Sequence, residues 1–139
     1  LEADARGIQV LEVKDESSRD FAAGSLQITT RGDQGSRSVT GAVFADEELR
    51  ITNIDAFPVT VSPSRHMLFT RHRDMPGIIG QLGSLLGEHN VNIASMQVGR
   101  KIVRGDAVMA LSLDDPIPPA LLQAVTAIEG IQEAHPVTL

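Results

Sequence analysis

The chain has 139 residues, of which 42% are hydrophobic and 22% are charged, and its formal net charge is −6. The length suits one domain or two small ones, and the acidic balance argues against general nucleic-acid binding, because phosphate neutralisation needs a basic surface. The chain contains no cysteine, which excludes disulfides and thiolate metal sites and fits a reducing compartment. No apolar run is long enough to span a membrane, so neither nucleic acid nor a membrane is expected as a partner.

Residues 1–62 are expected to form part of a β-rich α/β domain. The chain begins without methionine, as a piece of a longer protein would, and residues 1–6 are typical of a helix end that Gly7 caps. Five stretches are predicted as strands from their alternation or β-branched content: 8–14, 25–30, 37–44, 49–54 and 57–61. Because no complete helix accompanies these strands, a missing half of the domain is expected to cover one face of their sheet.

Residues 66–139 are expected to form a second domain, after the polar and proline-containing break at 62–66. Strands and helices follow one another as β-α-β-β-α-β, which is the ferredoxin-like arrangement and makes the protein α+β. The predicted strands are 66–73, 91–100, 106–113 and 131–139, and the predicted helices are 76–89 and 118–130. In this arrangement the last strand pairs with the first at a sheet edge, where Pro136 is tolerated because proline donates no ladder hydrogen bond.

The first helix of this domain carries two patterns. A stripe of apolar residues at helical spacing is predicted to face the core: Ile78, Ile79, Leu82, Leu85 and Leu86. Gly80, Gly83 and Gly87 lie on another side, and each interior glycine destabilises a helix by roughly 0.5–1 kcal/mol relative to alanine. Their spacing predicts close approach of another backbone, from either the sheet or a second subunit.

The corner between strand 66–73 and this helix is a candidate ligand site. Asp74 can cap the helix, and the N–H groups of the first turn can bind an anion, with Gly77 leaving the backbone open. A free amino acid needs donors for its carboxylate and an acceptor for its ammonium group, and this corner offers both. His72 at the strand end and the amide of Asn92 add further polar groups. Spacing alone leaves both a helix cap and a ligand site open.

The run RDMPGIIGQLGSLLGEHNVNIASM resembles the ACT domain of the D-3-phosphoglycerate dehydrogenase family, and the resemblance extends over residues 66–139. The preceding text, SRDFAAGSLQITT and SVTGAVFADEELRITNIDAFPVTV, is similar to the second half of that family's intervening, or allosteric substrate-binding, domain in its long form. The sequence is similar to those of the cyanobacterial and plastid types of this family. The resemblance therefore covers nearly the whole chain and implies a cytoplasmic protein, or one of the plastid stroma.

This resemblance implies regulation. ACT domains of the family pair side by side, and L-serine binds at their interface as a feedback inhibitor of the first step of L-serine biosynthesis. The implied ligand residues are His72 at the strand end, Asp74 for the ammonium group, the backbone of Met75 and Gly77, and Asn92 from the neighbouring subunit. The implied partners are L-serine, a second copy of the chain, and upstream catalytic and NAD-binding domains of the same parent chain.

The intervening domain of the family is thought to bind an anionic effector through basic residues. Arg50 stands at one such position and is the candidate anion-binding residue. A second such position falls near Ser62, which is not basic, and this departure weakens the expectation of an effector site in the first part of the chain.

Other functions have less support in the sequence. No catalytic partner is placed beside His72, no histidine spacing indicates a metal site, and no glycine-rich loop between a strand and a helix indicates a dinucleotide site. The chain is therefore expected to hold no catalytic residue, metal or cofactor, with NAD bound elsewhere in the parent. Two alternatives stay open: the regulatory region of an L-serine dehydratase, whose iron–sulfur cluster would need cysteines, and a small ferredoxin-like enzyme such as a mutase or phosphatase.

Overall fold

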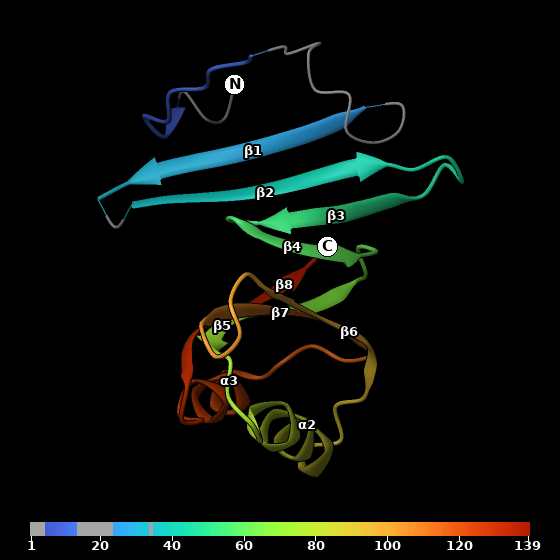
Figure 1. Cartoon of the computed structure of the whole chain (residues 1–139), viewed down its shortest axis with the longest axis vertical. Coiled ribbons are helices and arrows are strands. Elements are labelled where there is room, and N and C mark those ends of the chain that lie inside the picture. The colour runs from blue at the N-terminus through green and yellow to red at the C-terminus, as the bar shows by residue number, and fades with distance from the viewer. Residues whose placement is uncertain (1–4, 14–23, 34) are drawn as a thin grey trace.

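The computed structural model describes residues 5–13, 24–33 and 35–139. Two antiparallel sheets of four strands each make up most of this part of the chain, and two helices lie against the second sheet (Figure 1). The first sheet has the order β1-β2-β3-β4. Its strands are β1 (Ser25–Gly32), β2 (Gly35–Val43), β3 (Leu49–Ile54) and β4 (Phe57–Val61).

Four of the five strands predicted for the first part are confirmed, and the strand predicted at 8–14 is wrong over residues 8–13. These residues are irregular and exposed, and Lys14 lies outside the described residues. Alternation is a weak signal without a neighbouring strand to pair with, and no pairing of 8–13 is formed within the described part of the chain. The predicted helix end at 1–6 lies mostly outside it too, while Gly7 has the positive φ of 69° expected of a C-terminal cap.

The second sheet has the order β6-β7-β5-β8 and confirms the ferredoxin-like α+β prediction. Its elements are β5 (His66–Arg73), α2 (Ile78–Glu88), β6 (Ile93–Arg100), β7 (Asp106–Leu113), α3 (Pro119–Thr126) and β8 (Ile131–Thr138). The first and last strands pair, and Pro136 lies opposite Leu68 on the edge strand β8. No helix in the described residues is long and apolar enough to cross a membrane.

Helices α2 and α3 cover one face of the second sheet with a buried apolar layer. Its buried members are Leu68, Leu82, Leu86, Val91, Met109, Leu111, Leu113, Leu121 and Val125. The stripe predicted on α2 is confirmed for Ile78, Leu82 and Leu86, which are buried, and Leu85 packs against the layer. The prediction is wrong for Ile79, which is 45% exposed, because the apolar face of α2 is narrower than the run of apolar residues at its start.

The opposite face of the second sheet packs on β3 and β4 of the first sheet. Val61, Met67 and Ala110 form the buried centre of this contact, and Ile51, Ile54 and Phe69 pack around it. Strand β7 therefore has apolar neighbours on both faces, which explains why seven of its eight residues are buried.

One glycine sits where the two sheets meet most closely. A Cβ on Gly99 of β6 would overlap the carbonyl oxygen of Pro58 and lie 2.9 Å from Val59 Cγ1 of β4. The helix glycines behave differently, since a Cβ on Gly80, Gly83 or Gly87 would meet no atom within 4 Å. The prediction that the sheet approaches the glycine side of α2 is therefore wrong, because the sheet packs on the other side of the helix. Approach by a second subunit stays a prediction.

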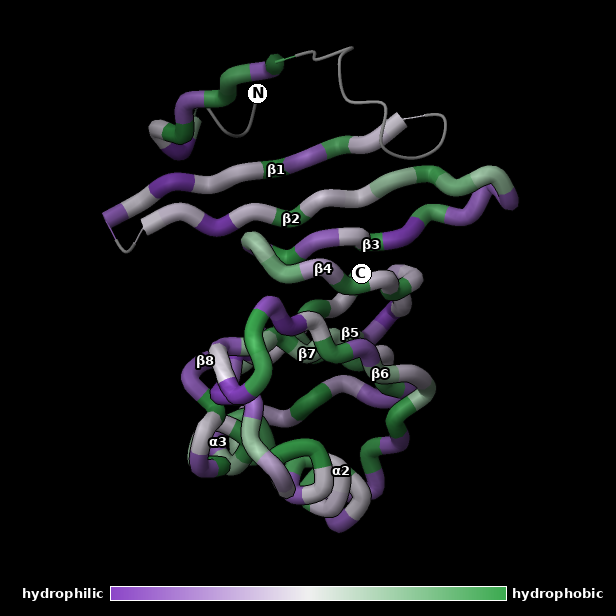
Figure 2. The backbone as a smooth tube through the Cα atoms, viewed as in Figure 1, coloured by the Kyte–Doolittle hydropathy of each residue, from purple (hydrophilic) through white to green (hydrophobic). Residues whose placement is uncertain are grey.

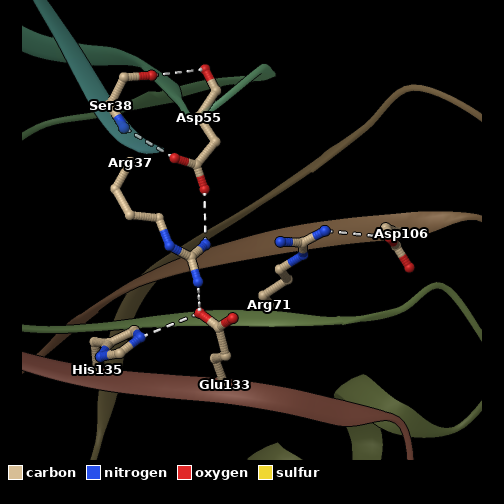
Figure 3. A network of polar contacts seen from close by, with 7 residues as sticks. All are labelled: Arg37, Ser38, Asp55, Arg71, Asp106, Glu133 and His135. Atoms are coloured by element: carbon tan, nitrogen blue, oxygen red, sulfur yellow. Dashed lines mark hydrogen bonds and ion pairs between the residues drawn. The ribbon is translucent and has the colours of Figure 1, made fainter. Parts of the chain in front are cut away.

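Polar contacts join the two sheets beside their apolar contact (Figure 3). Arg37 of β2 pairs with Asp55 at 3.0 Å and also with Glu133 of β8. Glu133 Oε2 also lies 3.3 Å from His135 Nε2. Asp55 accepts a hydrogen bond from the Ser38 N–H at 2.9 Å. These groups are half-exposed, so the ion pairs add little free energy and mainly fix the orientation of one sheet on the other.

The apolar face of the first sheet is only partly covered. Ile28 pairs with Val39, and Val39 pairs with Ile54, and directly opposed residues lie on the same face of a sheet. Ile54 packs against the second sheet, whereas Ile28 and Val39 are 61% and 45% exposed. Green and purple segments follow one another along part of β1, whereas β2 is mostly pale (Figure 2).

We predict that Gly99→Ala lowers the free energy of unfolding by about 1–3 kcal/mol, because the added methyl group overpacks the contact between β4 and β6. Gly83→Ala is the matched control. Its methyl group meets open space, so it should raise helix stability by roughly 0.5–1 kcal/mol. Urea denaturation of both variants measures the two effects, and equal stability of the two would contradict the assignment of Gly99 to the sheet contact.

Candidate ligand pocket at the end of β5

A pocket of about 320 Å³ opens where β5 ends and α2 begins. Its walls come from the segment between β5 and α2, the first turn of α2, and the β6–β7 hairpin. The lining residues are Asp74, Met75, Pro76, Gly77, Ile79, Arg100, Val103 and Arg104. Three of the predicted ligand residues are therefore brought together in one chain: Asp74, Met75 and Gly77.

Asp74 does not cap helix α2, and that prediction is wrong. The N-cap residue is Gly77, and no side chain makes a capping hydrogen bond there. Asp74 instead turns to the β6–β7 hairpin, where its Oδ2 accepts a hydrogen bond from Arg100 Nη1 at 2.7 Å and another from the Arg104 N–H at 3.0 Å. These two contacts, the arginine first, hold the pKa of Asp74 below its usual value, so the carboxylate is charged at neutral pH.

The first turn of α2 contributes free backbone donors. Gly77 adopts a φ of +90°, a conformation that side chains disfavour, and its carbonyl accepts the Gln81 N–H at 2.9 Å. The N–H groups of Ile79 and Gly80 have no acceptor among the described residues, as expected for a helix start without a cap. Of these two residues, Ile79 lines the pocket, and a free N–H group at a helix start suits an anionic group.

His72 does not line the pocket. Its side chain is 1% exposed, and its Nδ1 is 3.5 Å from Thr70 Oγ1. Burial lowers the pKa of His72, and the negative charge of Asp74 opposes that shift. The imidazole is therefore neutral at pH 7 and supports the strand end from inside the fold.

Asn92 lies at the other end of the sheet. It precedes β6, whereas the pocket adjoins Arg100 at the end of that strand, and eight residue steps at about 3.3 Å each separate the two by roughly 26 Å. The Asn92 amide donates to Asp114 Oδ2 at 2.7 Å. One chain therefore does not bring Asn92 to its own pocket.

Arg50, the candidate anion-binding residue, already has two acidic partners. It pairs with Asp46 and with Glu48, the latter at 3.0 Å, and its guanidinium carbon lies 4.7 Å from the centre of the Phe44 ring. An anionic effector would have to compete with both carboxylates, so the surroundings of Arg50 do not favour the predicted anion site.

The structure also bears on metals and dinucleotides. Within 5–13, 24–33 and 35–139, no group of three or more His, Asp or Glu side chains could hold a metal ion. The glycines of GQLGSLLG lie inside α2, so they do not form the loop that a dinucleotide diphosphate needs.

The sequence analysis did not identify Arg100 and Arg104 as site residues, because it assigned no role to the turn between the strands predicted at 91–100 and 106–113. The predicted order of strands contained the information needed to place these arginines near Asp74. Strands β5 and β6 both run antiparallel to β7, so the end of β5, the end of β6 and the start of β7 meet at one edge of the domain.

Comparison with known families agrees with this architecture. Residues 66–130 match the ACT domain family, and residues 1–55 match the D-3-phosphoglycerate dehydrogenase intervening domain family. The chain joins an intervening domain to an ACT domain. The pocket lies within the ACT match, strands β1, β2 and β3 lie within the intervening-domain match, and β4 falls between the two matched ranges.

The whole chain is similar to proteins named D-3-phosphoglycerate dehydrogenase. It is 60% identical over 139 residues to the protein of Synechocystis sp., covering all of this chain and 25% of that relative. It is 36% identical to the protein of Archaeoglobus fulgidus, covering 96% of this chain and 25% of the relative. The chain thus spans about a quarter of the length of these relatives.

A more distant similarity reaches a second enzyme class. The chain is 24% identical over 129 residues to a protein of Bacillus subtilis named probable L-serine dehydratase, beta chain, covering 93% of this chain and 58% of that relative. An intervening domain joined to an ACT domain is therefore similar to regions of proteins with two different names.

The buried His72 predicts how stability depends on pH. Its pKa is lower in the folded chain than the ordinary value of 6.5, so the unfolded chain binds this proton more readily. The free energy of unfolding should therefore decrease as the pH falls below about 6.5, by at most about 1.4 kcal/mol per pH unit.

Urea denaturation between pH 7.5 and 5.5 checks this prediction. His72→Gln should flatten the decrease, whereas His89→Gln, which replaces an exposed histidine, should leave it in place. An equal decrease in wild type and His72→Gln would show that another group is responsible.

Proposed function

We propose that the chain is the regulatory region of an NAD-dependent D-3-phosphoglycerate dehydrogenase, and that its ACT domain binds L-serine for feedback inhibition. The observation that carries this proposal is the similarity over all 139 residues to a protein of that name. The order of the two matched domains is consistent with it. Localisation in the cytoplasm or the plastid stroma remains a prediction.

The pocket supports an amino acid as the ligand. Asp74 offers a charged carboxylate, and the first turn of α2 offers N–H donors beside Met75 and Gly77. Charges of both signs within one pocket suit a zwitterion. The volume of about 320 Å³ holds a molecule of the size of L-serine with room for water or for a group from a partner chain.

The position of Asn92 supports a site shared between two chains. Because Asn92 lies roughly 26 Å from the pocket of its own chain along β6, we propose that it serves the pocket of a partner chain. In a two-fold symmetric pair each chain gives its partner what it receives, so two ACT domains would build two equivalent sites from Asp74 of one chain and Asn92 of the other.

The catalytic work is proposed to lie elsewhere in the parent chain. The relatives are about four times as long as this chain, and the helix glycines do not form a dinucleotide loop. The catalytic and NAD-binding domains would then occupy the remaining length. Serine binding can change activity in those domains only if the enzyme has two global states to which serine binds unequally. Assays of the parent enzyme with and without serine would measure that change in activity.

The regulatory region of an L-serine dehydratase is the second candidate. It is favoured by the 24% identity to the probable L-serine dehydratase beta chain and would use the same pocket. An assay of the full-length parent separates the two candidates, since the first requires NAD-dependent oxidation of 3-phosphoglycerate and the second requires deamination of serine.

Asp74→Asn tests the ligand role of Asp74 by removing its charge at nearly constant shape. A hydrogen bond to a charged group contributes about 1.5–3 kcal/mol, so L-serine affinity should fall by about 10- to 150-fold in isothermal calorimetry. Because Asp74 caps no helix, the melting temperature of the Asp74→Asn chain should be close to that of wild type. Asp33→Asn, which replaces an exposed acid that neither lines the pocket nor lies beside Asn92, is the charge-matched control, and undiminished binding by Asp74→Asn would refute the role.

Mixing two defective chains tests whether the site is shared. Asp74→Asn and Asn92→Ala chains should each bind L-serine weakly, while a dimer of one of each should regain one intact site, with both lesions in the other. Calorimetry of the refolded mixture should therefore recover tight binding at up to one L-serine per mixed dimer. No recovery in a mixture that forms dimers would place Asn92 outside the site.

A further inference from the structure

Arg100 is a pocket residue that neither the sequence pattern nor the family comparison assigned. It is the last residue of β6, and its side chain is 51% exposed while it pairs with Asp74 at 2.7 Å. An arginine has five N–H donors, and Nη1 alone is engaged in a described contact of this residue. The other N–H groups make no contact among the described residues, and Arg100 lines the pocket.

The hairpin that carries Arg100 is fixed against the corner from both sides of Asp74. The Asp74 N–H donates to the Gly105 carbonyl at 2.8 Å, and the Arg104 N–H donates to the Asp74 carboxylate at 3.0 Å. The turn itself is tight, since the Gly105 N–H donates to the Ile102 carbonyl at 3.0 Å. Arg100 is therefore held beside Asp74 by the backbone as well as by its own ion pair.

The two hydrogen bonds leave half of the Asp74 carboxylate available. Both go to Oδ2, and Oδ1 accepts none among the described residues. The pocket wall thus presents an acceptor oxygen and, next to it, a guanidinium group with free donors. This is an ordered pair of opposite charges, and the first turn of α2 adds N–H groups on the side of Met75 and Gly77.

We propose that Arg100 binds the α-carboxylate of the ligand and makes the pocket selective for zwitterionic α-amino acids. The ligand docks antiparallel to the Asp74–Arg100 pair, with its ammonium group on Asp74 Oδ1 and its carboxylate on the free donors of Arg100. This inference rests on the proposed function and deepens it, because it names the group that recognises the second charge of the ligand.

Selectivity follows from the alternation of charge. A zwitterion placed this way meets an opposite charge at both ends, and charge-assisted hydrogen bonds of arginine to carboxylate are among the stronger contacts in proteins. An amine without a carboxylate gains the Asp74 contact but meets the positive charge of Arg100 nearby. An acid without an amine gains Arg100 but meets the negative charge of Asp74. Both should therefore bind much more weakly than an amino acid.

Arg100→Gln tests this assignment on the full chain. The affinity of Arg100→Gln for L-serine should be about 10- to 100-fold lower than that of wild type by calorimetry. Arg100→Lys keeps the charge but loses the planar fork, so its affinity should lie between those of wild type and Arg100→Gln. Ethanolamine, which is serine without its carboxylate, should bind wild type weakly and Arg100→Gln at least as well, because the variant lacks the positive charge beside Asp74. The preference for L-serine over ethanolamine should therefore shrink in the variant.

Lys101→Gln is the matched control, because it removes one positive charge from the same hairpin at a residue that does not line the pocket. It should bind L-serine as wild type does. Circular dichroism and thermal unfolding should show that Arg100→Gln is folded, since an exposed ion pair contributes little to stability.

The outcomes separate this inference from the proposed function. If wild type binds L-serine and Arg100→Gln binds it as tightly, or loses ethanolamine and L-serine binding in equal measure, the assignment of Arg100 is overturned and the proposed function stands. If wild type binds no L-serine, the proposed function is overturned, and glycine, L-alanine and L-aspartate are then titrated. Binding of one of these that Arg100→Gln weakens supports the assignment, and no binding of any of them overturns it as well.

Discussion

The fold depends on the burial of one sheet on both of its faces. Strand β7 lies at its centre, between the apolar layer of α2 and α3 on one side and Val61 and Met67 on the other. A one-residue slip of this strand would turn Met109, Leu111 and Leu113 from the helix layer to the face where Ala110 now packs. That face cannot take the larger side chains without overpacking. The ends of β5, β6 and β7 are therefore fixed relative to one another, and the pocket is built on those ends.

Three connecting segments come together at the pocket, and the second sheet fixes their positions. They are the segments between β5 and α2, between β6 and β7, and between α3 and β8. The Arg73 N–H donates to the Gly130 carbonyl at 2.8 Å, and the Asp74 N–H donates to the Gly105 carbonyl at the same distance. Gly130 has a φ of +93°, and a Cβ there would lie 2.8 Å from Met75 Sδ. Since β8 continues from Gly130 to Glu133, which pairs with Arg37 of the intervening domain, only a short stretch of backbone separates the pocket wall from the contact between the domains.

The site was partly visible in the sequence. Asp74 and Gly77 were identified from the step between a strand and a helix, Met75 was implied by the family resemblance, and the structure places all three on one pocket. The role of Asp74 as a cap was wrong, because a cap is a local contact and the nearby hairpin offered the carboxylate a guanidinium and an N–H group at once. Arg100 was missed for the same reason, since it lies 26 positions further along the chain.

The sequence by itself determined the elements and their order. Hydrophobic period, prolines and glycines are local signals, and they were sufficient for the ferredoxin-like arrangement and for the four strands of the first sheet. Only the tertiary structure decided which polar groups meet, that His72 is buried, that Gly99 is the closely approached glycine, and that Arg100 pairs with Asp74. These facts depend on the distances between segments that are remote in the chain, and the periodicity of any one segment carries no information about its distance from another.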